Sequence, residues 1–130
     1  MVYTPDEKRK MDNVLAVFAE YTARHTGFDV AYSDKTGYVR LITDACADHC
    51  FFAISGFDDL MDMFCMEIVS EEVERQFRKN KNLENWDVDY DSIRLRIQGY
   101  IGRLEEAYQA QAAKVADKYI LERGLSPYLP

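Results

Sequence analysis

The densest cluster of metal-ligating residue types is the segment Cys46-Ala47-Asp48-His49-Cys50, and Cys65 follows further along the chain. Together they would supply the three thiolates and one imidazole of a Cys3His zinc site. Structural zinc sites usually present two close pairs of ligands, whereas the second half here is a single cysteine inside a predicted amphipathic helix. We therefore interpret Cys50 and Cys65 as small buried apolar residues, and predict no metal and no cofactor.

A cysteine nucleophile activated by His25 or His49 is a second chemistry to weigh. Neighbouring residues on a strand point to opposite faces, so His49 and Cys50 cannot share a proton if both lie in a strand. His25 lies near the end of a predicted helix, where a histidine complements the helix dipole. The sequence also lacks the motifs that mark common nucleotide and hydrolase chemistries. We therefore predict no catalytic residues.

Alternating carboxylates at Asp87, Asp89 and Asp91 are typical of the first half of an EF-hand calcium loop. The sixth position of such a loop is Ser92, where glycine makes the turn, and the twelfth is Gln98, where a glutamate binds calcium. The segment therefore predicts no calcium site. We expect Asp89 or Asp91 to cap the last helix instead.

The elements that position these residues begin with a helix at Thr4-Pro5-Asp6-Glu7, where Thr4 caps, Pro5 suits the first turn and Glu7 completes a capping box. Apolar residues recur at helical spacing behind it, and Gly27 ends the helix. Period-two patterns then predict strands at 28–33, 38–43 and 50–54. Three sequential strands with short links make an antiparallel meander.

A second long helix is predicted over 58–79. The alternative makes 63–69 a fourth strand and lets Ser70 cap a separate helix.

The last helix is predicted over 91–123, which is long for a chain of this size. Either Gly99 and Gly102 bend or break it, or its distal half projects and packs against something else. A projecting half predicts a homodimer through this helix. The residues expected to self-associate are Val115, Tyr119 and Ile120.

The fold class expected from these elements is α+β, in the order α-β-β-β-α-α: an N-terminal helix, a three-stranded antiparallel meander and two longer helices packed on the sheet. A chain of 130 residues has the usual size of one domain, which we expect to span 1–130. Within it, 80–90 is a polar linker loop and 125–130 a C-terminal tail.

The charge balance is acidic, with 23 acidic and 16 basic residues and a net charge of −7. The phosphate backbone repels such a protein, so we expect no direct nucleic-acid binding. No apolar run is long enough for a membrane span and no export pattern is visible, so we expect no membrane association and a cytoplasmic location. The three cysteines are then free thiols.

The predicted helix 58–79 carries a run of acids with no basic residue until Arg75. Such a face either confers only solubility or binds a basic partner. The residues expected to bind the partner are Asp58, Asp59, Asp62, Glu71 and Glu74.

The function expected from size, charge and the acidic run is that of a non-enzymatic interaction protein. It would be a small acidic regulator, adaptor or inhibitor of a protein partner, for example a phage or bacterial immunity-related inhibitor that covers a basic, nucleic-acid-binding surface. The alternative is a small-molecule-binding or enzymatic domain with a pocket between sheet and helices. Polar residues that face inward from the strands, such as Arg40, Thr43 or His49, would favour that alternative.

Overall fold

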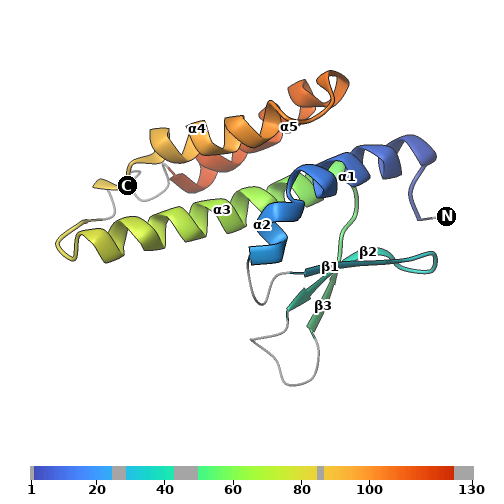
Figure 1. The fold of residues 1–130 in the computed structure, drawn as a ribbon, viewed down its shortest axis with the longest axis horizontal. Helices are drawn as coiled ribbons and strands as arrows, with labels where there is room; N and C mark the ends of the chain where they lie inside the picture. Colours follow the sequence, from blue (N-terminus) through green and yellow to red (C-terminus); the bar gives the residue numbers. More distant parts are fainter. Residues whose placement is uncertain (1, 25–28, 43–49, 85–86, 125–130) are drawn as a thin grey trace. The chain divides into compact units, whose positions relative to one another are not determined.

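The structure is a computed structural model that describes residues 2–24, 29–42, 50–84 and 87–124. Its elements confirm the α+β class: helices, then a three-stranded antiparallel sheet, then longer helices (Figure 1). Their order is α1 (Pro5–Val17), α2 (Ala19–Arg24), β1 (Asp29–Ser33), β2 (Gly37–Ile42), β3 (Cys50–Ala53), α3 (Phe57–Lys79), α4 (Tyr90–Ile101), α5 (Glu106–Tyr119) and the short π-helix η2 (Ile120–Gly124). Contacts divide the chain into two compact units, 1–60 and 61–130, with the boundary inside α3.

The start of α1 follows the sequence prediction in part. Thr4 Oγ1 accepts a hydrogen bond from Glu7 N at 3.1 Å, and Pro5 occupies the first turn. The Glu7 carboxylate, however, accepts from Phe57 N at 2.6 Å, at the start of α3. Glu7 therefore serves the N-terminus of a helix fifty residues away in sequence, where a carboxylate stabilises both the unpaired N–H groups and the dipole.

The predicted first helix is divided at Phe18 into α1 and α2. Phe18 is fully buried, with its ring edge-on to that of Tyr21 at 6.5 Å. Backbone bonds from Phe18 N to Val14 O and from Thr22 N to Phe18 O continue across the bend. Gly27, the predicted end of this helix, lies outside the described residues.

The sheet has the order β1-β2-β3, with both neighbouring pairs antiparallel, as predicted for a meander. Tyr38 in β2 lies opposite Tyr32 in β1, and its carbonyl accepts from Ile54 N just beyond β3. Gly37 ends the first turn with φ 72°, a conformation that glycine adopts without strain.

The hydroxyl of Tyr3 joins β2 to the residue just beyond β3. It donates to Ile54 O at 2.6 Å and accepts from Tyr38 N at 2.8 Å, and its ring stacks on that of Tyr38. A Cβ atom at Gly37 would lie 2.6 Å from the Tyr3 hydroxyl, so this glycine is required by space as well as by φ.

The helix α3 is continuous from Phe57 to Lys79, so the prediction over 58–79 is confirmed and a fourth strand at 63–69 is wrong. Its N-terminal two-thirds are buried over a wide arc. The buried residues are Phe57, Leu60, Met61, Met63, Phe64, Cys65, Ile68, Val69 and Glu72.

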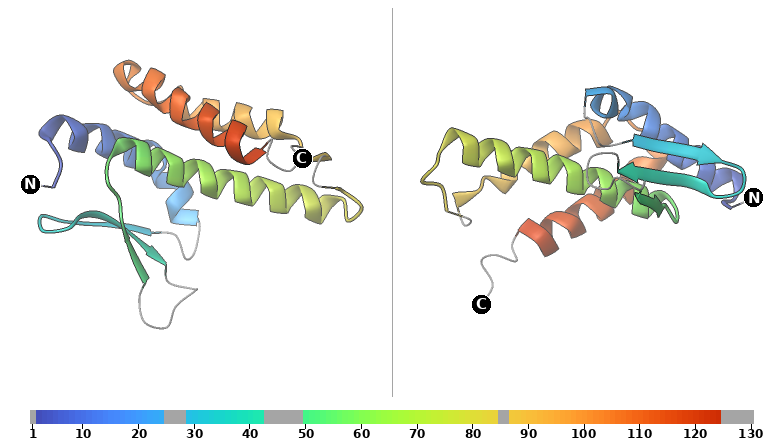
Figure 2. Two further views of the ribbon diagram at one scale, coloured as in Figure 1. Left: turned by 180° about the vertical axis from the view of Figure 1, so that it is seen from behind. Right: turned by 90° about the horizontal axis from the view of Figure 1, so that it is seen from below.

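The predicted last helix over 91–123 is not one element, because α4 ends at Ile101 and α5 begins at Glu106. The alternative of a break at Gly102 is confirmed. The two helices lie side by side (Figures 1 and 2). Gly102 caps α4, and Arg103 N and Leu104 N donate to carbonyls three residues earlier, which tightens the last turn. Gln109 Nε2 in α5 donates to Leu104 O at 2.9 Å and fixes the reversal.

Candidate functional site

A network of ion pairs connects α3 to α4 in the second unit. Arg96 Nη1 in α4 lies 2.6 Å from Glu72 Oε1 and 2.9 Å from Glu71 Oε1. Glu72 Oε2 also pairs with Arg75 at 2.5 Å. Glu72 is 7% exposed, and this burial is supported because its carboxylate accepts from two guanidinium groups.

The network holds the Arg96 side chain in one place. Burial lowers the pKa of Arg96, but hydrogen bonds to Glu71 and Tyr100 outweigh burial, so that the pKa lies above its usual range. Arg96 therefore remains a cation at every physiological pH. Its position is set by α3. A second arginine, Arg103, is exposed in the turn that follows α4.

A shallow depression of about 250 Å³ lies on α4, lined by Arg96, Gly99, Tyr100 and Arg103. Two guanidinium groups and a phenol surround it, and none of these four residues is acidic. The space above Gly99 is open, because a Cβ atom added there would meet no other atom within 4 Å.

Leu95 is the most exposed large apolar side chain among the described residues, at 67%. It lies one helical turn before Gly99. Residues four apart share one face of a helix, so Leu95 lies on the side of α4 that carries Gly99, next to the four lining residues. We call Leu95, Arg96, Gly99, Tyr100 and Arg103 the α4 surface. Its composition of arginine, tyrosine and an exposed leucine matches protein interfaces, which are rich in arginine and aromatic residues.

The five acids predicted to bind a partner do not share one role. Asp59 accepts from Ser55 N at 2.9 Å at the start of α3, which is a capping interaction, and Glu71 pairs with Arg96. Asp62 and Glu71 are nine residues apart, which at about 100° per residue places them on opposite sides of the helix.

The remaining acids of that set, Asp58, Asp62 and Glu74, are exposed. Glu74 forms a loose pair with Arg78 at 3.7 Å, with both side chains well exposed. The acidic run of the sequence is therefore distributed around α3 rather than gathered on one face.

The residues predicted to self-associate lie in the returning half of the α4–α5 hairpin. Ile120 is 3% exposed, and Val115 and Tyr119 are half-buried. The projecting helix on which the dimer prediction depended is not observed, because the chain reverses between Ile101 and Glu106. A homodimer through these residues stays a prediction.

The candidate metal and thiol sites are only partly described. Cys46, His49 and His25 lie outside the described residues, as does the side chain of Cys50. Burial, with a smaller contribution from the Asp62 carboxylate, raises the pKa of the Cys65 thiol to about 12. That thiol is therefore protonated at neutral pH and packs as a small apolar group, as the sequence indicated.

The candidate calcium loop acts as a helix start. Asp89 Oδ1 accepts from Ser92 N at 3.1 Å, which confirms the predicted cap of α4. Asp87 Oδ2 accepts from Glu84 N at 3.2 Å within the same segment. Among the described residues, no three or more His, Cys, Asp or Glu side chains gather as metal ligands.

The linker predicted over 80–90 joins α3 to α4, with residues 85–86 outside the described part, and the tail 125–130 is outside it entirely. Of the polar strand residues named for an internal pocket, Arg40 is half-buried in β2 opposite Val30 and Phe52. Thr43 and His49 are outside the described residues. The pocket between sheet and helices stays a prediction.

The α4 surface was missed by sequence reasoning, although a signal for it exists. From Ser92 to Leu104 the chain has three arginines and no acid, in a protein whose net charge is −7. The pairing of Arg96 with Glu71 and Glu72 could not be read from the sequence, because about 25 residues of chain separate these partners.

No protein-family model, curated protein or solved structure matches this chain. Within the part of the chain that the structure describes, every helix is too short or too polar to cross a membrane.

Proposed function

We propose that this protein is a non-enzymatic interaction module, an adaptor, regulator or inhibitor that binds a protein partner through the α4 surface. The observation that carries the proposal is Leu95, 67% exposed beside a depression lined by two arginines and a tyrosine. Binding energy in protein interfaces concentrates in a few residues, among which arginine and tyrosine are enriched.

Two features of the α4 surface besides its charge support this proposal. Arg96 is already ordered by Glu71 and Glu72, so a partner that contacts it loses little side-chain entropy on binding. Leu95 contributes apolar area that water now covers, and burying it is worth about 25 cal/mol per Å². Both features favour association without any change in the fold.

The test is affinity isolation from the native host with wild-type protein and Leu95→Asp. We expect the exposed substitution to leave the free energy of unfolding within about 0.5 kcal/mol while the wild-type partner is lost. Leu121→Asp is the matched control, because Leu121 is similarly exposed at 58% but lies in η2. Equal recovery of partners by wild type and Leu95→Asp would contradict the proposal.

A second candidate is the acidic inhibitor of a basic protein, supported by the exposure of Asp58, Asp62 and Glu74. Exposed charges act mainly on association rate, and salt screens them. Replacing these three by Asn and Gln should slow association with the isolated partner and reduce its salt dependence. A partner that binds this variant at the wild-type rate excludes the candidate.

A further inference from the structure

We propose that the outer edge of β3 pairs with β3 of a second copy of this chain, so that two three-stranded sheets join into one antiparallel sheet. This interaction surface belongs to the first unit, whereas the α4 surface belongs to the second. In the part of the chain that the structure describes, β3 is an edge strand, because the sheet order is β1-β2-β3. An edge strand presents backbone N–H and C=O groups that another strand can bind.

The register of the sheet identifies which backbone groups of β3 face outward. Ile54 N donates to Tyr38 O at 3.0 Å, and hydrogen-bonded pairs alternate along an antiparallel ladder. Phe52, two residues earlier, therefore also bonds to β2, whereas the backbone groups of Phe51 and Ala53 point away from β2. These two residues make up the open edge.

The open edge has a defined end and no protecting residue. Ser55 N donates to Asp59 Oδ2 at 2.9 Å, so this N–H is already bound at the start of α3. Edge strands are commonly protected by charged residues or proline, and the segment 50–55 contains neither. The side chains of Phe52 and Ala53 are both exposed. The edge is therefore accessible to a second strand.

The opposite edge of the sheet, formed by β1, is protected. The same alternation points Val30 N away from β2, and this N–H donates to Asp29 Oδ1 at 2.8 Å. The Asp29 side chain is exposed, and like charges on paired strands repel each other. Pairing of two copies through β1 is therefore disfavoured, which leaves β3 as the edge for self-association.

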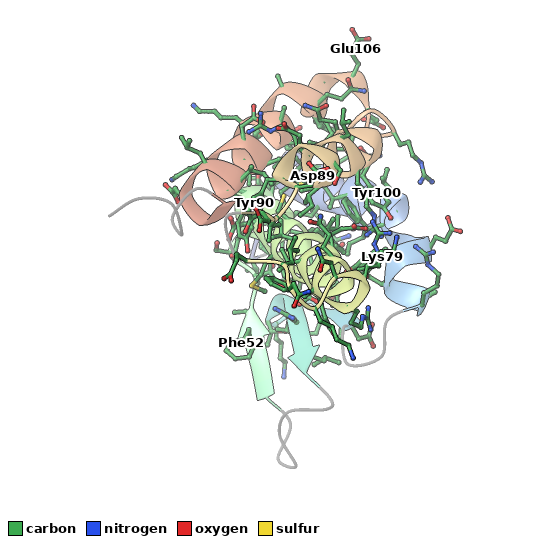
Figure 3. All side chains as sticks on the ribbon, turned by 90° about the vertical axis from the view of Figure 1, so that its left-hand side faces the viewer. Phe52, Lys79, Asp89, Tyr90, Tyr100 and Glu106 are labelled. Atoms are coloured by element: carbon green, nitrogen blue, oxygen red, sulfur yellow. The ribbon has the colours of Figure 1, made fainter. Side chains whose placement is uncertain are left out.

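A two-fold axis at Phe52 uses every group of the open edge. Phe51 of each copy then pairs with Ala53 of the other, which makes two hydrogen-bonded pairs between the copies. The two Phe52 side chains face each other at the closest cross-strand spacing, where aromatic pairs are favourable. Phe52, labelled in Figure 3, is 52% exposed in the single chain. One contact therefore covers both the open edge and the exposed ring.

A second copy fits this edge better than a strand of a charged partner does. The edge carries no charge for such a partner to recognise, whereas its own donors and acceptors are self-complementary. The contact is weak, because an edge of four residues buries less than the about 800 Å² per partner of a stable interface. The net charge of −7 repels a second copy, so the dimer should become tighter as salt rises.

The experiment is sedimentation equilibrium of the full chain from about 10 μM to about 1 mM, at low and high sodium chloride. We expect a monomer–dimer equilibrium that is tighter at high salt. In nitrogen-15 NMR spectra over the same range, the amide signals of Phe51 and Ala53 should shift with concentration. A monomeric mass throughout, or a dimer that salt weakens, would overturn the proposal.

Variants test the edge directly, with circular dichroism to verify that each is folded. Phe52→Lys places a charge at the two-fold axis and should weaken dimerisation at least about tenfold. Ala53→Pro removes an outward N–H and no bond to β2, and should have a similar effect. Leu121→Lys is the matched control, with the same charge change at a side chain that is 58% exposed in η2. Equal losses from Phe52→Lys and Leu121→Lys would overturn the edge.

Further results distinguish this dimer from the other surfaces. A dimer lost by Leu121→Lys alone would move the interface to the region of Val115, Tyr119 and Ile120. Leu95→Asp should leave dimerisation unchanged, because the α4 surface is not part of the edge. If the chain stays monomeric and a protein isolated from the host is lost by Phe52→Lys, the edge binds that protein and the second copy is excluded.

Discussion

The two units of the molecule connect their elements by different chemistry. In the first unit, side chains bind backbone groups: the Tyr3 hydroxyl joins Ile54 O to Tyr38 N, and the Glu7 carboxylate accepts from Phe57 N. In the second unit, side chains also bind one another: Arg96 lies between Glu71 and Glu72, in addition to two bonds between the Gln76 side chain and the backbone of Asp89. The bonds of Tyr3 and Glu7 hold backbone atoms, whereas the ion pairs with Glu71 and Glu72 hold the guanidinium of Arg96.

The proposed partner-binding surface lies in the second unit, because the side chains there are more accessible to a partner. The Tyr3 hydroxyl of the first unit belongs to a buried residue and already makes two bonds. The arginines of the second unit reach the solvent, with 26% of the Arg96 side chain exposed. The Tyr3 hydroxyl bonds of the first unit are therefore not accessible to a partner, whereas the Arg96 network of the second unit also borders a surface.

The largest expected effect tests the backbone bonds of the first unit. Tyr3→Phe removes the hydroxyl and leaves Ile54 O and Tyr38 N without their buried partner, so unfolding free energy should fall by about 2–4 kcal/mol. Chemical denaturation measures the loss. Tyr32→Phe is the control, at a tyrosine 39% exposed on the neighbouring strand, and should change stability by less than about 0.5 kcal/mol. Equal losses in the two variants would show that the Tyr3 hydroxyl contributes no more to the free energy of unfolding than an exposed tyrosine hydroxyl does.

The second effect concerns the ion-pair network. Glu72→Gln keeps the shape but removes the charge between Arg75 and Arg96, and should cost about 1–3 kcal/mol because Glu72 is buried. Glu74→Gln makes the same change at an exposed pair on the same helix and should cost less than about 0.5 kcal/mol. Denaturation of both variants at low and high salt checks the difference. Two equal losses would mean that burial of Glu72 does not matter.

A smaller effect is expected at the reversal between α4 and α5, where a side chain of the second unit binds a backbone carbonyl. Gln109→Leu removes the donor to Leu104 O and should cost about 1 kcal/mol. Thermal unfolding by circular dichroism measures it. Gln98→Leu, an exposed position on α4, is the control. A variant as stable as the wild type would show that the reversal is held by packing alone.

The smallest expected change has the opposite sign. Gly99→Ala should raise unfolding free energy by about 0.5–1 kcal/mol, because alanine favours the helix and its Cβ meets no atom. Gly37→Ala is the contrasting variant and should destabilise the first unit, since its φ is 72° and its Cβ would overlap Tyr3. Calorimetry of the two variants gives both signs. A Gly99→Ala protein less stable than wild type would mean that the open space above this glycine is filled.

The local features of this fold were readable from the sequence. The Thr4 cap, the Asp89 cap and the continuous helix α3 each depend on residues within one or two helical turns. The antiparallel meander also followed from short links and alternating residues. Such features are local, so a single sequence determines them without knowledge of distant partners.

The tertiary structure decided where the chain reverses and which charges pair. Ile97, Ile101 and Leu104 keep helical spacing across the break at Gly102, so periodicity alone could not reveal two helices. The acids that suggested a partner-binding face were divided by the fold, since Glu71 pairs with Arg96, 25 residues away, whereas Asp58, Asp62 and Glu74 stay exposed. In the sequence these acids look equivalent. Packing decides which of them pair, because only packing brings particular opposite charges within hydrogen-bonding distance.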